Sequence, residues 1–218
     1  MFVGHLAVAL AAKSKVPRVP LWAFVSAAYG LDLAWPLLLL VGAERVLVDP
    51  GNTAFTHLAF VSYPWSHSLA MVLLWGALAG MVGARVFVAS RIGWLVGAVV
   101  VSHWFLDFVT HRPDLPLWPG GPMVGLGLWQ SVPGTILVEG GIFITAVVWY
   151  VRAAPPRDRV GPWALWSLVA LTGFIWISQP WSPPPPSALA VALVSLSMWV
   201  FPIWAHWIDR HRTSSRAA

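Results

Sequence analysis

The chain alternates between long apolar segments and short polar ones. Six segments approach the roughly 20 apolar residues that a helix needs to cross a bilayer. They lie at about 20–43, 67–88, 92–110, 131–151, 162–179 and 187–208. A seventh apolar stretch, 2–12, is too short to span and lacks the basic leading segment of a signal peptide. The pattern predicts an all-α polytopic membrane helix bundle with about six transmembrane helices. The short N-terminal stretch is expected to form a half-helix that dips into the membrane or packs against the bundle.

The composition excludes a water-soluble protein. Apolar residues make up 58% of the 218 positions and charged residues only 10%, whereas a soluble domain carries about 25% charge. Mean hydropathy is +0.74. The net charge of +5 does not indicate a nucleic-acid partner, because the basic residues lie in short runs between apolar segments. There is no cysteine, so any metal site must use nitrogen and oxygen ligands.

The basic residues predict the orientation of the chain. They cluster before the first span, between the second and third, between the fourth and fifth, and after the sixth. The runs are Lys13, Lys15 and Arg18; Arg85 and Arg91; Arg152, Arg157 and Arg159; and Arg210, Arg212 and Arg216. Because basic loops stay in the cytoplasm, both termini are expected there. The loops at about 44–66 and 111–130 would face the other side, and residues 1–218 would form one membrane domain. The part of this domain that carries the candidate polar site would lie at about 1–151, and two further spans would follow at about 162–208.

Two pairs of small residues indicate a close contact between helices. Gly76 and Gly80 are four residues apart in the second span, and Gly93 and Gly97 are four apart in the third. Small residues at this spacing let membrane helices approach closely. A packing role explains them without any chemistry.

Six ionisable side chains lie inside or at the edge of the apolar segments. They are His5, Asp32, His67, His103, Asp107 and Glu139. A charged group in a bilayer costs roughly 2.5–3.5 kcal/mol on insertion scales, so its presence there indicates function. For a single membrane histidine, packing with one hydrogen bond is the simpler interpretation, and only convergence of several groups favours a site.

The positions of these residues along their helices indicate convergence. Asp32, His103 and Glu139 each lie twelve residues from the expected cytoplasmic end of their span, roughly 18 Å at the helical rise. Asp107 lies one turn further out, and His67 lies nearer the outer edge. His5, in the half-helix, would lie roughly 12 Å above the cytoplasmic end of that helix. All six could therefore line one pocket in the outer half of the bundle.

The spacing within the third span favours a metal site. His103 and Asp107 are four residues apart and so share one helical face, which lets both side chains converge on one point, as metal ligands must. His111 extends that face by a further turn. Pro36 cannot donate the helical hydrogen bond to the Asp32 carbonyl, which predicts a kink beside that acid.

The remaining histidines and the glycine-rich loop have simpler explanations. His57 is expected in a loop, and His206 and His211 lie among arginines at the cytoplasmic interface. The segment 120–127 lacks the Lys and Ser/Thr pattern of a phosphate-binding loop, so it is interpreted as a re-entrant or interfacial turn.

Residues 1–115 contain a pattern that resembles the bacterial membrane-bound metal-dependent hydrolases, the LexA-regulated inner-membrane group. The matching elements are the Gly-His of His5, Asp32 in the first long span, Ser66-His67-Ser68, and His103 with Asp107. The chain departs from that pattern in three places. Leu31 stands where the family has Pro, Ala34 where it has a second Asp, and Pro64-Trp65 where it has a basic residue. The resemblance implies an integral protein of the bacterial inner membrane with metal-dependent hydrolase activity.

The leading hypothesis is therefore a membrane-embedded hydrolase. His67, His103 and Asp107 would ligate a divalent metal, with Asp32 and His5 completing or bridging the site. Zinc is the default for such ligands, and manganese or iron are alternatives. Glu139 would be the general base or a further ligand, and Asp32 could also take part in catalysis. Six candidates exceed the ligands of one zinc, which implies a second metal or a dedicated base. The outer-half position favours a membrane lipid as substrate, attacked at an ester or phosphoester.

Two other classes of function remain open at this point. Buried acids and histidines also form relays in transporters of protons or metal ions. Against this, no polar residues continue from Asp32 or Glu139 to the cytoplasmic side, and no inverted repeat is seen. The third class is a non-catalytic membrane scaffold that holds a structural metal.

Overall fold

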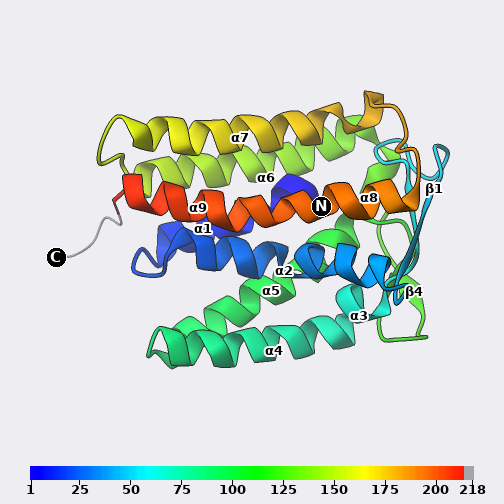
Figure 1. Ribbon diagram of the computed structural model, residues 1–218, viewed down its shortest axis with the longest axis horizontal. Coiled ribbons are helices and arrows are strands. Elements are labelled where there is room, and N and C mark those ends of the chain that lie inside the picture. The colour runs from blue at the N-terminus through cyan, green and yellow to red at the C-terminus, as the bar shows by residue number, and fades with distance from the viewer. Residues whose placement is uncertain (214–218) are drawn as a thin grey trace.

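In the computed structural model, which describes residues 1–213, long helices run side by side and short β-hairpins close one end (Figure 1). Six helices within this range are long and apolar enough to cross a membrane. They are α2 (Leu21–Leu40), α4 (Leu69–Val86), α5 (Ser90–Thr110), α6 (Val132–Ala153), α7 (Val160–Ser178) with its 3₁₀ extension to Trp181, and the segment Ala188–His211. The last comprises α8 (Ala188–Ser195), a 3₁₀ turn and α9 (Val200–His211). The chain is an all-α integral membrane protein, as the sequence predicts.

The N-terminal half-helix lies within the bundle. Helix α1 (Phe2–Lys15) is buried along most of its length and packs against α6, α2 and α5. Lys13 and Lys15 lie in its last turn, where a positive charge stabilises the helix dipole. The Lys13 Nζ donates to the carbonyl oxygens of Pro17 and Val19 and lies 3.5 Å from the Asp209 carboxylate on α9. These contacts fix one end of α1, so that its other end projects into the middle of the bundle.

Helices α4 and α5 are in direct backbone contact through their glycines. A Cβ at Gly93 would lie 2.4 Å from the carbonyl oxygen of Gly80, and one at Gly97 would lie 2.7 Å from that of Gly76. The predicted close packing of these two pairs is confirmed. Much of the rest of α4 faces outward, so this seam is its principal attachment.

The two longer loops, at about 44–66 and 111–130, contain short hairpins, which the sequence does not predict. Strand β1 (Arg45–Val48) pairs antiparallel with β2 (Leu58–Ser62), and β3 (Leu115–Pro116) pairs with β4 (Met123–Val124). These strands contain few β-branched and aromatic residues and lie among prolines and glycines. The strand pattern in the sequence is therefore too short to be recognised. The glycine-rich segment 120–127 belongs to the second hairpin. Gly125 has a positive φ, and a Cβ there would meet the Arg112 carbonyl oxygen at 2.2 Å. Between these hairpins and the spans lie α3 (Pro64–His67) and a 3₁₀ turn (Leu128–Gln130).

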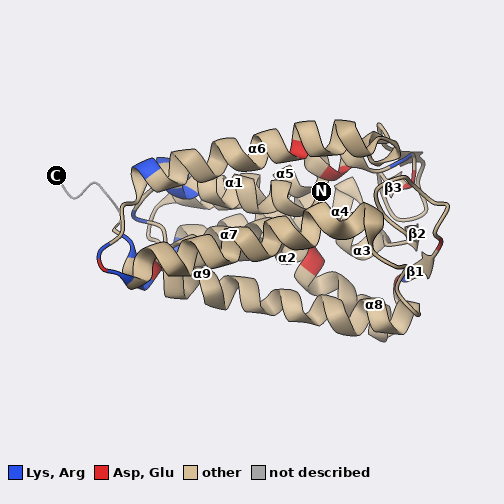
Figure 2. Cartoon of the chain, turned by 90° about the horizontal axis from the view of Figure 1, so that it is seen from above, with Lys and Arg blue, Asp and Glu red and all other residues tan. Residues whose placement is uncertain are grey.

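Charge is distributed unevenly along the bundle. Figure 2 shows most Lys and Arg at the end where α9 finishes, while acidic residues also occur midway along the helices. The basic residues therefore lie together at one end of the bundle, and the cytoplasmic orientation of that end stays a prediction. The N-terminal residue lies elsewhere: Met1 is buried within the bundle, because α1 begins there and runs toward the basic end.

Candidate metal centre

Five of the six predicted site residues come together inside the bundle. They are His5 on α1, Asp32 on α2, His67 at the end of α3, and His103 and Asp107 on α5. Four of the five are buried, and Asp32 is partly exposed. Together they form two groups of three that could hold a metal ion: His5, His103 and Asp107, and Asp32, His67 and His103.

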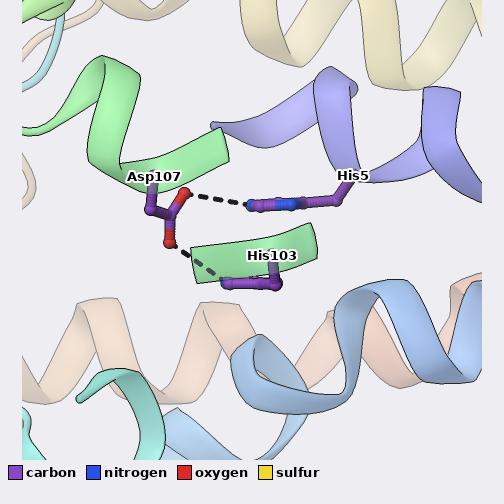
Figure 3. A group of neighbouring side chains, drawn as sticks. All are labelled: His5, His103 and Asp107. Carbon is purple, nitrogen blue, oxygen red and sulfur yellow. Dashed lines mark ion pairs between the residues drawn. The ribbon is translucent and has the colours of Figure 1, made fainter. Parts of the chain in front are cut away.

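The first group is held by short contacts to both oxygens of Asp107. His5 Nε2 lies 3.2 Å from Oδ1, and His103 Nε2 lies 3.1 Å from Oδ2. The two imidazole rings are stacked, with centroids 3.7 Å apart and planes within 3°. Figure 3 shows both rings pointing toward the carboxylate from different helices.

The second group surrounds Asp32. Its Oδ1 lies 3.5 Å from His67 Nε2 and 3.6 Å from His103 Nε2. The two histidine Nε2 atoms are 3.3 Å apart. His103 therefore belongs to both groups and lies at the centre of the cluster.

Local structure explains how each side chain reaches the centre. His103 and Asp107 share one face of α5, as their spacing predicts. Helix α2 continues through Pro36, which leaves the Asp32 carbonyl without its helical donor. His67 does not open the second span: it ends α3, and Ser68 caps α4 by accepting from Met71 N.

A backbone carbonyl sets the tautomer of His103. Its Nδ1 lies 2.8 Å from the carbonyl oxygen of Ala28. A carbonyl can only accept, so Nδ1 carries the proton and donates. In the neutral ring, Nε2 then presents a lone pair to the cluster.

A hydrogen-bonded chain sets the tautomer of His67 in the same way. The Ser66 hydroxyl donates to Glu44 Oε2 at 2.7 Å and lies 2.6 Å from His67 Nδ1. Because the only hydroxyl proton points to the carboxylate, His67 Nδ1 must donate to the serine oxygen. Glu44 also accepts from the backbone N–H groups of Trp65 and Ser66, at 2.9 and 2.8 Å. The lone pair of His67 Nε2 therefore faces the cluster.

These two tautomers make the donor set fit a cation. The unprotonated Nε2 atoms of His67 and His103 lie 3.3 Å apart, and carboxylate oxygens lie beside them. Their lone pairs repel one another unless a positive charge lies between them. Histidine nitrogen and carboxylate oxygen are ligands that zinc takes in proteins. The hydrogen bonds from each Nδ1 are the outer contacts that commonly orient metal-binding histidines.

Glu139, the sixth predicted residue, lies apart from both groups. It is fully buried on α6, where Oε1 accepts from the Gly4 N–H at 3.2 Å and Oε2 has no hydrogen-bond partner. The α-amino group of Met1 donates to Asp107, beside the same end of α1. The structure does not bring Glu139 into the donor set, and its role as a base stays a prediction.

A small cavity adjoins the cluster on the hairpin side. Its volume is about 140 Å³, and its walls include His5, Asp32, His67, Asp107 and His111, with Phe60 and Trp129 among the aromatic ones. The Asp32 side chain is 22% exposed, against 3% for Asp107. Asp32 is thus the acid of the cluster most open to a molecule in this cavity.

His111 is held in the cavity wall by two outer residues. Its Nδ1 lies 2.9 Å from Asp114 Oδ1 and 3.2 Å from the Tyr63 hydroxyl oxygen. Burial, and then the nearby Asp114 carboxylate, raise the pKa of Tyr63 well above its usual value. The Tyr63 hydroxyl therefore stays protonated and donates to Asp114 at 3.2 Å.

The other histidines lie away from the cluster. His57 is in a loop, with Nε2 3.0 Å from the Ser182 carbonyl oxygen, as expected. His206 is exposed on α9. His211 lies at the basic end, where its Nδ1 is 2.8 Å from Asp158 Oδ2. None of the three is in either donor group.

Glu44 is the site residue that sequence reasoning misses. It lies in the loop before β1, next to Arg45 in the sequence, yet the residue is only 1% exposed. Its distance in sequence from Ser66, 22 residues, hides the contact. The residue that could have pointed to Glu44 is Ser66, just before His67, because a buried serine hydroxyl needs a hydrogen-bond partner.

Replacing Glu44 with Gln is expected to lower metal affinity about 10–100-fold, as loss of an outer-shell carboxylate commonly does. The amide NH₂ can donate to Ser66, which would then free the serine proton for His67 Nδ1 and change its tautomer. Zinc affinity is measured by competition with a chelator, beside the thermal unfolding midpoint. Asp49→Asn, on the same hairpin loop, is the control and should keep wild-type affinity. Equal affinity in wild type and Glu44→Gln would contradict the positioning role.

Comparison of the chain with protein-family models, with curated proteins and with solved structures finds no match. Inferences about function therefore rest on the residues and their geometry.

Proposed function

We propose that this protein is a membrane-embedded, metal-dependent hydrolase, the activity that its motif resemblance implies. The observation that carries the proposal is the pair of facing Nε2 atoms of His67 and His103, both oriented as acceptors and flanked by Asp32 and Asp107. A buried arrangement of this kind is costly unless it binds a cation.

One ion is expected, with His103 as its central ligand. The Nε2 of His103 belongs to both donor groups, but an imidazole nitrogen has one lone pair and its Nδ1 is already bonded to Ala28. The two groups therefore cannot each hold an ion through His103. His67 and Asp107 would be further ligands and His5 would complete the set, while Asp32 would stay free to act as a base. Zinc suits these donors best, and manganese or iron remain alternatives.

The metal and the surrounding residues would have different roles in hydrolysis. A divalent metal held by these residues would supply Lewis acidity for an ester or phosphoester oxygen and would lower the pKa of a water molecule toward neutral. Asp32, the more exposed acid, is placed to accept the proton of the attacking water. The aromatic walls of the cavity limit bulk water, which strengthens the electrostatic contacts inside.

The substrate class proposed is an ester or phosphoester of a membrane lipid. The cavity lies within a bundle of membrane-spanning helices, on the side closed by the hairpins. By resemblance the membrane is the bacterial inner membrane, and the cavity would face its outer half.

The test is metal-dependent hydrolysis by purified protein. Detergent-solubilised protein, stripped and then reloaded with zinc, is assayed on a lipid phosphoester and a lipid carboxylic ester. Activity that needs the metal supports the proposal. No activity on either substrate, together with metal flux in proteoliposomes, would replace it with transport.

Replacing Asp32 with Asn is expected to lower the turnover of the loaded enzyme about 100-fold or more, the usual contribution of a positioned base. The rate is compared at saturating zinc, so that weaker metal binding does not contribute. Asp158→Asn, at the basic end, where the carboxylate contacts His211 instead of α1, is the matched control and should retain the wild-type rate. Turnover unchanged in Asp32→Asn would rule out its role as base.

A further inference from the structure

An apolar groove runs along the membrane-facing side of α2, α4 and α5. Its volume is about 620 Å³. Trp22 lies at one end and Leu38 at the other, while Gly30 lies between them on α2. Val96 and Val100 of α5 contribute to its lining. The groove therefore lies between helices that cross the membrane.

The lining favours an apolar occupant. Apart from tryptophan indoles, its polar side chains are two serines, Ser26 and Ser66. The Ser66 hydroxyl already donates to Glu44, so it has no proton for a ligand in the groove. Trp75 likewise uses its ring N–H, which donates to the Trp65 carbonyl oxygen. A polar or charged molecule would find few partners here.

The dimensions suit one extended chain better than a helix. Sixteen residues separate Trp22 and Leu38, about 24 Å at the helical rise. A helix about 10 Å across and 24 Å long occupies roughly 1900 Å³. Even when the open space at its mouth is included, the groove holds only about 1410 Å³. The length also exceeds half of the roughly 30 Å hydrocarbon core, so a long chain can be accommodated.

The groove ends beside the candidate metal centre. Val96, Val100, His103 and Asp107 form one stripe on α5, so the face that lines the groove continues as the face that carries the donors. At the outer end, Ser66 lines the groove while the next residue, His67, lines the cavity. Ser66 and His67 therefore lie between the two spaces.

We propose that the groove binds one hydrocarbon chain of a membrane lipid, and that this lipid is the substrate whose head group reaches the metal centre. The second part rests on the proposed hydrolase function. The chain would lie along α2, with its polar end near Ser66, where the groove and the cavity adjoin.

Gly30 offers a way to fill the groove without disturbing the fold. A Cβ at Gly30 meets nothing within 4 Å, so Gly30→Leu can extend into the groove. Gly141 on α6 is equally open but lies outside the groove, which makes Gly141→Leu the matched control.

The binding part is tested with a phosphatidylglycerol that carries a diazirine in one acyl chain. Wild-type protein in vesicles of this lipid is irradiated, and the labelled peptides are identified by mass spectrometry. Labels should concentrate on the groove faces of α2 and α4, and Gly30→Leu should reduce them at least five-fold. Gly141→Leu should leave them unchanged. Even labelling of all outward helix faces, equal labelling in Gly30→Leu, or cross-links between two protein copies through the groove would overturn the proposal.

The substrate part is tested by the dependence of hydrolysis on chain length. Gly30→Leu should raise KM for a long-chain ester about ten-fold while leaving KM for a short-chain ester, and zinc content, unchanged. Equal effects on both esters would overturn the link between groove and centre. If labelling is confined to the groove but no ester is hydrolysed, the hydrolase function fails and chain binding stands.

Discussion

Asp107→Asn is expected to weaken zinc binding by more than about 100-fold and to abolish hydrolysis. Loss of an outer-shell partner alone commonly costs 10–100-fold in affinity, and Asp107 lies in the inner set. Its two oxygens lie 3.2 Å from His5 Nε2 and 3.1 Å from His103 Nε2, so it joins the two stacked rings. Asparagine keeps the shape but removes the charge and replaces one acceptor oxygen with a donor. The affinity is measured by chelator competition and activity at saturating zinc.

Asp158→Asn is the control for that experiment. Asp158 also pairs with a histidine, His211, but at the basic end of the bundle. The variant should bind zinc and turn over substrate as the wild type does. If Asp107→Asn keeps full zinc content and full activity, the metal centre proposed here does not exist.

Gly93→Ala is expected to destabilise the bundle by about 1–3 kcal/mol, the range for overpacking a filled interior. The new methyl group would lie 2.4 Å from the Gly80 carbonyl oxygen and 2.7 Å from the Ala84 Cβ. Backbone atoms cannot yield locally, so α4 and α5 must separate. The free energy of unfolding in detergent, measured by denaturant titration, gives the size of the effect.

Gly141→Ala should change stability in the opposite direction. It makes the same substitution on a helix, but its Cβ meets nothing within 4 Å. Replacing such a glycine stabilises by about 0.4–1 kcal/mol, because the unfolded chain loses freedom. Similar destabilisation by both variants would show that the glycine seam has no special role.

The helical part of the fold follows closely from the sequence. The length of the apolar segments alone predicts the six spans, and the glycine pairs correctly predict the contact between α4 and α5. Hairpins such as Arg45–Val48 with Leu58–Ser62 are missed, because strands of four or five residues in a Pro- and Gly-rich loop carry almost no periodicity.

The candidate site is predicted in part. Helical depth brings Asp32, His103 and Asp107 to one region, since rise per residue is constant. The same reasoning does not bring Glu139 into either donor group, because its buried carboxylate meets the Gly4 N–H at the start of α1 instead. Glu44 could not be found at all: its role depends on a loop folding back onto Ser66.

The most direct test of the metal centre is the metal content of the wild-type protein. Protein purified in detergent without chelators, and reloaded with zinc, is measured by elemental mass spectrometry beside His103→Ala. One equivalent of metal in the wild type, lost in the variant, is the predicted result, because His103 belongs to both donor groups. No bound metal in the reloaded wild type would contradict the account, and the buried acids and histidines would then form a proton or ion pathway.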